Sequence, residues 1–325
     1  MEHGLDGCPC VILDCPGGPD PYAHAGEVAC AIAPLLAERP ALLAVQGDTS
    51  SALGGALAGF AAAVPVAHVE AGLRSFDPTM PWPEEEFRTA IDARASLLFA
   101  PTDISAANLE AEGASGLIFV TGNTGIDALL ALELPTAPPP ERHDDRLKLL
   151  VTCHRRESWG SGLQSIAEAL VRLATACPLA IDFVLHPNPA VAGTMRELLA
   201  GCPAIRLMEP LGHGQMIKAM QASDILLSDS GGMQEEAPAL GVPLLVLRAK
   251  TERPEGVASG NMLLVGTDTR RIVDGVVRLL DPAVRTAMSR RAFPYGDGRS
   301  ADRIAGHIAD FLGENAAGLA HVRRA

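Results

Sequence analysis

The chain has 325 residues, a length that predicts about two domains, each large enough to bury a core of its own. Hydrophobic residues make up 48% of it and aromatic residues only 4%, a composition typical of helices alternating with buried parallel strands. The net charge of −13 argues against general binding to nucleic acid or to an anionic membrane. An anionic ligand would have to be held by local donors in a small-molecule pocket.

The seven cysteines are odd in number and show no paired C-x-x-C spacing. This usage argues against a zinc site or a disulfide framework and favours a reducing cytoplasm. No cationic start followed by an apolar stretch indicates a signal peptide. The longest run of small apolar residues, 51–69, is broken by three glycines and a proline, so a helix followed by a strand is expected there.

The first half of the chain alternates strand-like and helix-like segments. We expect strands at 11–13 and 41–45 on either side of a helix over 25–38. The segments expected next are a helix over 50–63, a strand over 64–69, a helix beginning near Glu84, a strand over 96–100 and two more units ending near Leu132. Four prolines between 134 and 146 predict a linker, which divides the chain into domains 1–138 and 139–325.

The second half begins a new alternation with a strand over 147–151. Apolar residues then recur at steps of three and four and predict an amphipathic helix, with Leu163, Ile166, Leu170 and Leu173 on its buried face. Strands are expected near 183–185, 205–207, 225–227 and 244–247. The predicted fold class is therefore α/β, with two Rossmann-like doubly wound domains that bind ligands at their strands' carboxyl ends, in the cleft between the domains.

The segment 228–238, SDSGGMQEEAP, is the most informative because it follows an apolar strand and opens a helix. Ser230, Gly231 and Gly232 lie where a helix start offers unpaired backbone N–H groups to a phosphate. Glu235 and Glu236 follow about one turn later, where a carboxylate could accept hydrogen bonds from sugar hydroxyls. The alternative is a tight turn whose glycines serve only the backbone.

Three carboxylates are predicted near strand ends or a helix start in the first domain. Asp48 and Glu70 each follow a predicted strand, and Glu84 lies in the first turn of a predicted helix after Pro83. Each could be a cap or a surface salt bridge when considered alone. Clustered carboxylates perturb one another's protonation, however, so the three together predict acid and base catalysis.

The second domain carries cationic side chains at comparable positions. His154, Arg155 and Arg156 end its first strand, His186 ends the next, and Arg253 follows a later one. Such a cluster can neutralise a pyrophosphate leaving group. The alternatives are that the arginines bridge to nearby acids and that His186 only fixes a turn.

With these motifs in order, the chain resembles the non-hydrolysing UDP-N-acetylglucosamine 2-epimerases. The resemblance runs from about Gly47 to Gly298. The segments that carry it are Gly47-Asp48-Thr49, His68-Val69-Glu70-Ala71-Gly72-Leu73-Arg74, Pro81-Trp82-Pro83-Glu84-Glu85, Thr121-Gly122-Asn123-Thr124, His154-Arg155-Arg156-Glu157, Asp229-Ser230-Gly231-Gly232, Glu235-Glu236-Ala237-Pro238 and Thr251-Glu252-Arg253-Pro254-Glu255.

The resemblance implies a glycosyltransferase-B-like fold and a homodimer that interconverts UDP-N-acetylglucosamine and UDP-N-acetylmannosamine without a metal or other cofactor. It assigns acid and base roles to Asp48, Glu70 and Glu84, and assistance to the leaving pyrophosphate to His154. The residues it implies in UDP-sugar binding are Arg88, Arg155, His186, Ser230, Gly231, Gly232, Glu236 and Arg253. The product would serve a capsule or another surface polysaccharide, and the final helix would pack back on the N-terminal domain.

Two departures from the family pattern stand out. The family begins with a strand and a turn of the type Gly-Thr-Arg-Pro-Glu, which has no counterpart here, so we expect the first strand-helix unit to be missing. Cys153 replaces the glycine that usually precedes the family's histidine. Two alternatives to an active epimerase therefore remain, a truncated inactive homologue that binds UDP-sugars and a glycosyltransferase of the same fold.

Overall fold

The computed structural model describes residues 9–132, 146–155 and 159–322, with side chains up to residue 313. The chain forms two compact units, the first from residues 1–72 and 81–120 and the second from residues 73–80 and 121–325. The predicted α/β class with two parallel sheets is confirmed. The predicted domain boundary at residue 138, the linker, Arg156 and Glu157 all lie outside the described residues.

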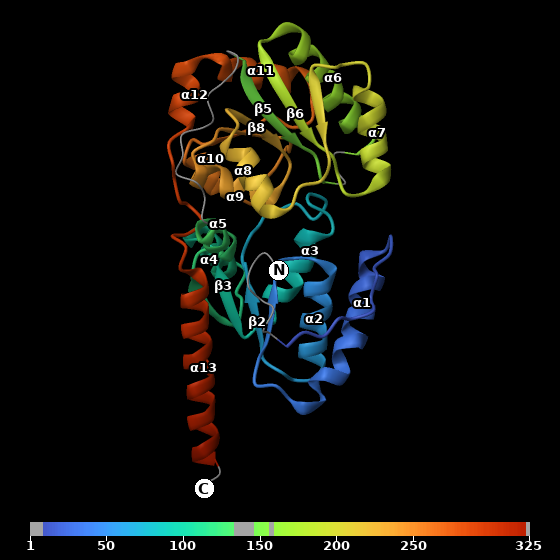
Figure 1. Cartoon of the computed structure of the whole chain (residues 1–325). Helices are drawn as coiled ribbons and strands as arrows, with labels where there is room; N and C mark the ends of the chain where they lie inside the picture. Colours follow the sequence, from blue (N-terminus) through green and yellow to red (C-terminus); the bar gives the residue numbers. More distant parts are fainter. Residues whose placement is uncertain (1–8, 133–145, 156–158, 323–325) are drawn as a thin grey trace. The chain divides into compact units, whose positions relative to one another are not determined.

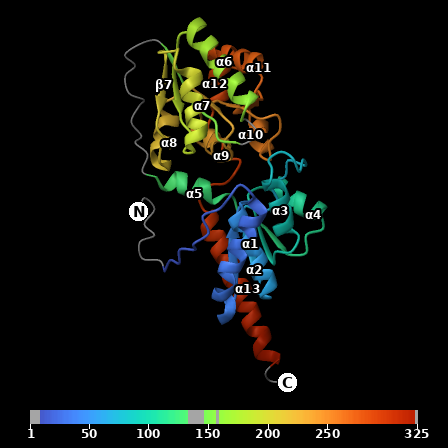
Figure 2. The same cartoon turned by 90° about the vertical axis from the view of Figure 1, so that its right-hand side faces the viewer.

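The first unit is built on a parallel sheet whose described strands lie in the order β1-β2-β3-β4. Two of its helices, α1 and α2, lie side by side (Figure 2). The elements of this unit are α1 (Pro21–Ile32), η1 (Ala33–Glu38), β1 (Leu43–Gln46), α2 (Ser50–Ala61), β2 (Val66–Val69), α3 (Glu84–Asp92), β3 (Leu97–Ala100), α4 (Asp103–Ala111) and β4 (Leu117–Val120).

The second unit holds a parallel sheet in the order β10-β9-β8-β5-β6-β7 (Figure 1). Its strands are β5 (Leu147–Thr152), β6 (Leu179–Val184), β7 (Ile205–Met208), β8 (Ile225–Ser228), β9 (Leu244–Val246) and β10 (Met262–Leu264). Its helices are α5 (Thr124–Ala131), α6 (Ser161–Ala176), α7 (Pro189–Leu199), α8 (His213–Gln221), α9 (Gly231–Leu240), α10 (Pro254–Ala258), α11 (Thr269–Leu280), α12 (Pro282–Met288) and α13 (Ser300–Val322).

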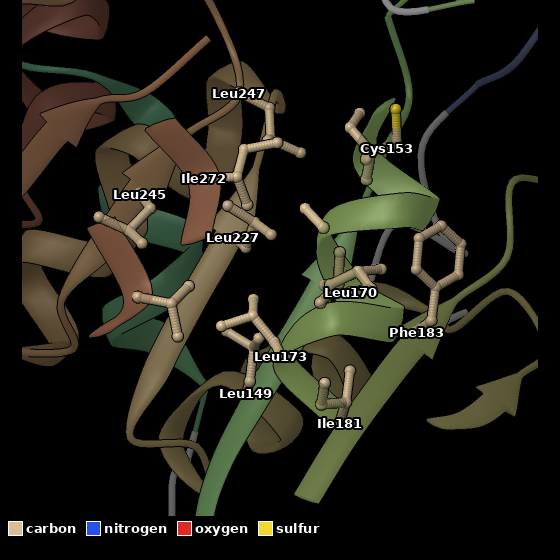
Figure 3. Packing of buried hydrophobic residues seen from close by; sticks show 14 of the residues in the cluster. Leu149, Cys153, Leu170, Leu173, Ile181, Phe183, Leu227, Leu245, Leu247 and Ile272 are labelled. Carbon is tan, nitrogen blue, oxygen red and sulfur yellow. The ribbon is translucent and has the colours of Figure 1, made fainter. Parts of the chain in front are cut away.

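Alternate residues of β5 face opposite sides of this sheet and enter two separate cores. Leu149 and Val151 pack with residues of α6 and α11, and Figure 3 shows Leu149 beside Leu173 in that cluster. Leu150 packs on the other side with residues of α8 and α9. A strand buried on both faces requires the continuous apolar pattern that the sequence shows at 147–151. The predicted buried face of α6 is confirmed, since all four of its leucine and isoleucine residues are in the core.

The prediction of a strand at 11–13 is wrong. This segment has no regular structure, and Val11 and Ile12 are 65% and 92% exposed. Three apolar residues without a neighbouring strand in the described chain cannot form a stable sheet, and prolines and glycines follow at once. The expectation that a first strand-helix unit is missing stays a prediction. The sequence analysis also missed β10, which has only three residues.

The last helix, α13, packs against α5 within the second unit. Its return to the N-terminal domain stays a prediction. No helix among the described residues is long and apolar enough to cross a membrane.

A test of the fold uses two glycines in the left-handed region, where a Cβ costs about 1–2 kcal/mol. Gly241 ends α9 with φ of +71°, and a Cβ there would lie 2.7 Å from the carbonyl oxygen of Ser289. Gly260 has φ of +82° and open space around it. In urea unfolding followed by circular dichroism, Gly241→Ala should lose about 1–3 kcal/mol more than Gly260→Ala, because only the former is also overpacked. Equal losses would contradict this account of the α9 terminus.

Candidate active site

The strand order of the second sheet changes direction between β5 and β8. Connections leave these neighbouring strands toward opposite sides, so their carboxyl ends leave room for a ligand. The residues after β5 are Cys153, His154 and Arg155, and those after β8 are Asp229 and Ser230. The structure therefore brings the predicted cationic segment and the predicted phosphate turn to the same edge of one sheet.

Asp229 joins the two segments. Its carboxylate accepts hydrogen bonds from the backbone N–H of His154 at 2.7 Å and of Arg155 at 2.9 Å. The Sγ of Cys153 donates to the same carboxylate at 3.4 Å. Asp229 is fully buried, so these bonds replace the water that the charge has lost. Sequence reasoning quoted Asp229 within its motif but gave it no role, because the bonds it makes cross 75 residues of chain.

The start of α9 has the geometry expected of an anion-binding turn. Ser230 is the N-cap residue, and its hydroxyl accepts a hydrogen bond from the N–H of Met233. Gly231 is needed for close approach, because a Cβ there would lie 3.0 Å from the Cζ of Arg253. Gly232 faces open space and is exposed. The first turn of a helix offers backbone N–H donors with partial positive charge, so this turn suits a phosphate.

Arg253 lies in a buried network of charges. Its Nε donates to Glu235 at 2.6 Å, and its guanidinium also pairs with Glu252. Tyr295 donates from its hydroxyl to the backbone oxygen of Arg253 at 3.0 Å. Arg155 approaches Glu252 to 3.9 Å. Arg155 and Arg253 therefore both contact carboxylates, which is the alternative that the sequence left open. Arg155 lies just after the end of β5, and Arg253 lies beside the start of α9.

Glu236 is buried in α9 and is bonded to His213 at 2.8 Å. Burial raises the pKa of the Glu236 carboxyl above its ordinary value, while the hydrogen bond from His213 opposes that shift. A carboxylate held this way can accept from a hydroxyl group. Sequence reasoning missed His213, which follows a glycine in a segment without any recognisable motif.

The two histidines at the strand ends lie together, with ring centroids 5.5 Å apart. Burial lowers the pKa of His154 below its ordinary value; Asp229 opposes this shift, and His186 and Arg155 reinforce it. His186 accepts a hydrogen bond at Nδ1 from the N–H of Asn188 at 2.9 Å.

The first unit assembles its predicted carboxylates at strand ends. Asp48 follows β1 and Glu70 follows β2, and these strands are neighbours. A Cβ added to Gly47 would lie 3.4 Å from the Oε2 of Glu70, so the Glu70 carboxylate lies against the residue before Asp48. Glu70 has φ of +71°, a left-handed conformation that non-glycine residues rarely adopt. Such strain is typical of functional sites.

Helix α3 adds a cation to these carboxylates. Arg88 is buried and pairs with Asp48, and it also bonds to Glu85 at 3.2 Å. Glu84 is the first residue of α3 and lies one helical turn before Arg88. The structure thus places Asp48 and Arg88 in direct contact and Glu70 against Gly47, while Glu84 is placed only by its position in α3. Among the described residues, no group of three or more His, Cys, Asp or Glu is arranged to hold a metal.

The fold and these residues define an α/β protein with carboxylates at strand ends in one unit and a helix start that suits an anion in the other. The model of the UDP-N-acetylglucosamine 2-epimerase family matches residues 10–309, and the chain belongs to this family. The chain is 43% identical over 298 residues to a UDP-N-acetylglucosamine 2-epimerase of Escherichia coli strain K12, covering 86% of this chain and 79% of the relative.

Two solved structures support the same assignment. The Neisseria meningitidis UDP-GlcNAc 2-epimerase bound to UDP-GlcNAc has a TM-score of 0.84 and 35% identity, with 90% of this chain and 84% of that one covered. The Methanocaldococcus jannaschii enzyme in complex with UDP-GlcNAc and UDP has a TM-score of 0.79 and 32% identity, with 90% and 82% covered. The glycosyltransferase-B-like fold expected from the sequence is confirmed.

The contact between Asp229 and the His154 segment can be tested by titration. His154 should titrate below the ordinary histidine value of about 6.5, and Asp229→Asn should lower its pKa further because a nearby negative charge is lost. Proton NMR of the imidazole resonances, assigned with His154→Gln, measures both values. Asp224→Asn is the control, since Asp224 likewise accepts a backbone N–H, that of Lys148 at 2.8 Å, at the opposite end of β5. A rise of the His154 pKa in Asp229→Asn would contradict the assignment.

Proposed function

We propose that this chain is a UDP-N-acetylglucosamine 2-epimerase that interconverts UDP-N-acetylglucosamine and UDP-N-acetylmannosamine. The observation that carries the proposal is the family match over residues 10–309, together with a phosphate turn and clustered carboxylates at strand ends. The glycosyltransferase alternative is not favoured, because the relatives are named as epimerases, and the measurement below separates an active enzyme from an inactive homologue.

The reaction proceeds by elimination and re-addition. A carboxylate removes the proton at C2 of the sugar, and the electron pair of that C–H bond forms a C1–C2 double bond. The C1–O bond breaks, and its electron pair leaves with UDP. A proton is then delivered to C2 on the opposite face while a phosphate oxygen of UDP adds back to C1. Atoms and electrons balance over the two steps, so the reaction consumes no oxidant, reductant or other co-reactant.

We assign the proton transfers to Asp48, Glu70 and Glu84; the pairing of Asp48 with Arg88 and the approach of Glu70 to Gly47 support this assignment. The reaction needs one group that accepts the C2 proton and one that delivers a proton from the other face, so more than one carboxyl group is required. Arg88 balances the charge of this cluster and contributes to binding of the sugar portion.

We assign the UDP portion to the second unit. The N–H groups that follow Ser230, at Gly231 and Gly232, bind phosphate oxygens, and Glu236 accepts from a ribose hydroxyl. His154 donates a hydrogen bond to the departing pyrophosphate. Arg155, His186 and Arg253 complete the phosphate environment.

The cellular role is part of the same proposal. We infer a homodimer in a reducing cytoplasm that supplies UDP-N-acetylmannosamine for a surface polysaccharide. Sedimentation analysis of the purified chain tests the dimer directly.

The decisive measurement is proton NMR of UDP-N-acetylglucosamine incubated with the purified chain in deuterated water. Epimerisation replaces the C2 proton with deuterium from the solvent, so the H2 signal should disappear while resonances of UDP-N-acetylmannosamine appear. A folded sample that binds UDP but produces neither change would overturn the proposal in favour of an inactive homologue.

The carboxylate assignments predict that Glu70→Gln and Asp48→Asn each lower the exchange rate about 10²–10⁴-fold, the range expected for loss of acid or base catalysis. UDP affinity, measured by calorimetry, should remain unchanged because the UDP-binding groups belong to the other unit. Glu110→Gln is the matched control, since Glu110 is an exposed residue of α4. Exchange at the wild-type rate in Glu70→Gln would remove that residue from the mechanism.

A further inference from the structure

His68 is a fully buried histidine of β2 that the proposed reaction does not use. Its Nδ1 lies 2.6 Å from an oxygen of Asp92, and its Nε2 lies 2.9 Å from the carbonyl oxygen of Gly47. A carbonyl oxygen only accepts hydrogen bonds, so Nε2 carries a proton. The Asp92 carboxylate receives a second bond from the N–H of Gly72 at 3.1 Å, as expected of an ionised group whose two oxygens both accept.

We propose that His68 is a positioning residue for catalysis: its ring, protonated on both nitrogens, ties together the turns that carry Asp48 and Glu70 and places a fixed positive charge beside them. The inference rests on the proposed function and deepens it. His68 does not touch the reacting atoms in this assignment, and it acts through the residues that do.

The hydrogen bonds of His68 and Asp92 reach both turns. Gly47 immediately precedes Asp48, and Gly72 follows Glu70 by two residues. Three positions in these turns have positive φ, with +69° at Gly47, +71° at Glu70 and +84° at Gly72. Glycine adopts this region freely, but at Glu70 it persists only where surrounding contacts hold the backbone. The hydrogen bonds that link Gly47 to His68, His68 to Asp92 and Asp92 to Gly72 supply such contacts.

Two charged groups bear on the ring. Asp92 of α3 bonds to it directly, and Asp48 after β1 acts through its charge. Burial alone would lower the pKa of His68, but the bond to Asp92 and the two nearby carboxylates outweigh burial and raise it. The competing arrangement places the proton on Asp92 and leaves a neutral ring with the same hydrogen bonds, and the experiment distinguishes the two.

The first arm of the test is ¹⁵N NMR of the full chain labelled at histidine, with the His68 signals assigned by their loss in His68→Gln. The inference predicts that both ring nitrogens are protonated at pH 7. His24 is the internal control, because its Nε2 faces the carbonyl of Cys15 at 3.2 Å while its Nδ1 faces the hydroxyl of Ser50 at 2.6 Å. A hydroxyl can donate, so His24 needs only one proton. An unprotonated His68 nitrogen at pH 7 overturns the proposal.

The second arm is kinetic. In His68→Gln the value of kcat should fall on the order of 10- to 100-fold, the size expected when catalytic groups shift by about 1 Å. KM and the affinity for UDP should be unchanged, and the acid limb of the pH–rate profile should move to higher pH because a cation that favours ionised carboxylates is lost. His24→Gln makes the same change in the same unit and should leave kcat and the profile unchanged. A wild-type profile in His68→Gln overturns the positioning role.

Asp92→Asn covers the case in which His68→Gln does not fold. The amide oxygen still accepts from Gly72, and the amide N–H₂ donates to Nδ1, so the ring becomes neutral without loss of a bond. One His68 nitrogen should then appear unprotonated, and kcat should fall as in His68→Gln. Unchanged kcat with a neutral ring overturns the charge role. If the wild-type chain shows no epimerisation, the proposed function fails, while the NMR result for His68 still stands or falls by itself.

Discussion

Each unit of this protein depends on one buried aspartate that accepts backbone N–H groups at the ends of parallel strands. Asp229 holds the segment after β5, and Asp92 holds the turn after β2. Hydrogen bonds to a charged group contribute about 1.5–3 kcal/mol each, and a buried charge left without them is strongly destabilising. The carboxylate therefore has few alternatives to the observed geometry. The turns that it fixes carry the groups to which we assign catalysis and binding.

The parallel sheet explains why these aspartates are needed. Parallel strands bring all their carboxyl ends to one edge, where the backbone must turn sharply into the following helix. The turn after β2 uses φ of +71° at Glu70, which a side chain adopts only under constraint. This backbone conformation directs the carboxylate of Glu70 toward Gly47, in the turn after β1. A turn with negative φ at Glu70 would be less strained but would point this carboxylate elsewhere.

Much of this arrangement is predictable from the sequence, and the rest is not for identifiable reasons. The strand ends at Asp48, Glu70 and His154 follow apolar runs and lie where the motifs indicated. The bond between His68 and Asp92 joins residues 24 positions apart, and no local pattern encodes it. The prediction of a strand at 11–13 failed for the opposite reason. The local pattern is apolar, but no neighbouring strand among the described residues pairs with this segment.

In the proposed reaction UDP leaves C1 of the sugar and then adds back to it, and the charges of the second unit suit both steps. Arg253 pairs with Glu235 and Glu252, which offset part of its positive charge, and Glu252 also pairs with Arg155 and Arg248. The N–H groups at the start of α9 are partial charges, and burial keeps His154 closer to its neutral form. A site rich in unmatched cations would hold UDP so tightly that re-addition to C1 became unfavourable. In the proposed mechanism, hydrogen-bond donors of modest charge would stabilise the departing pyrophosphate and still leave it able to react, as a reversible epimerisation requires.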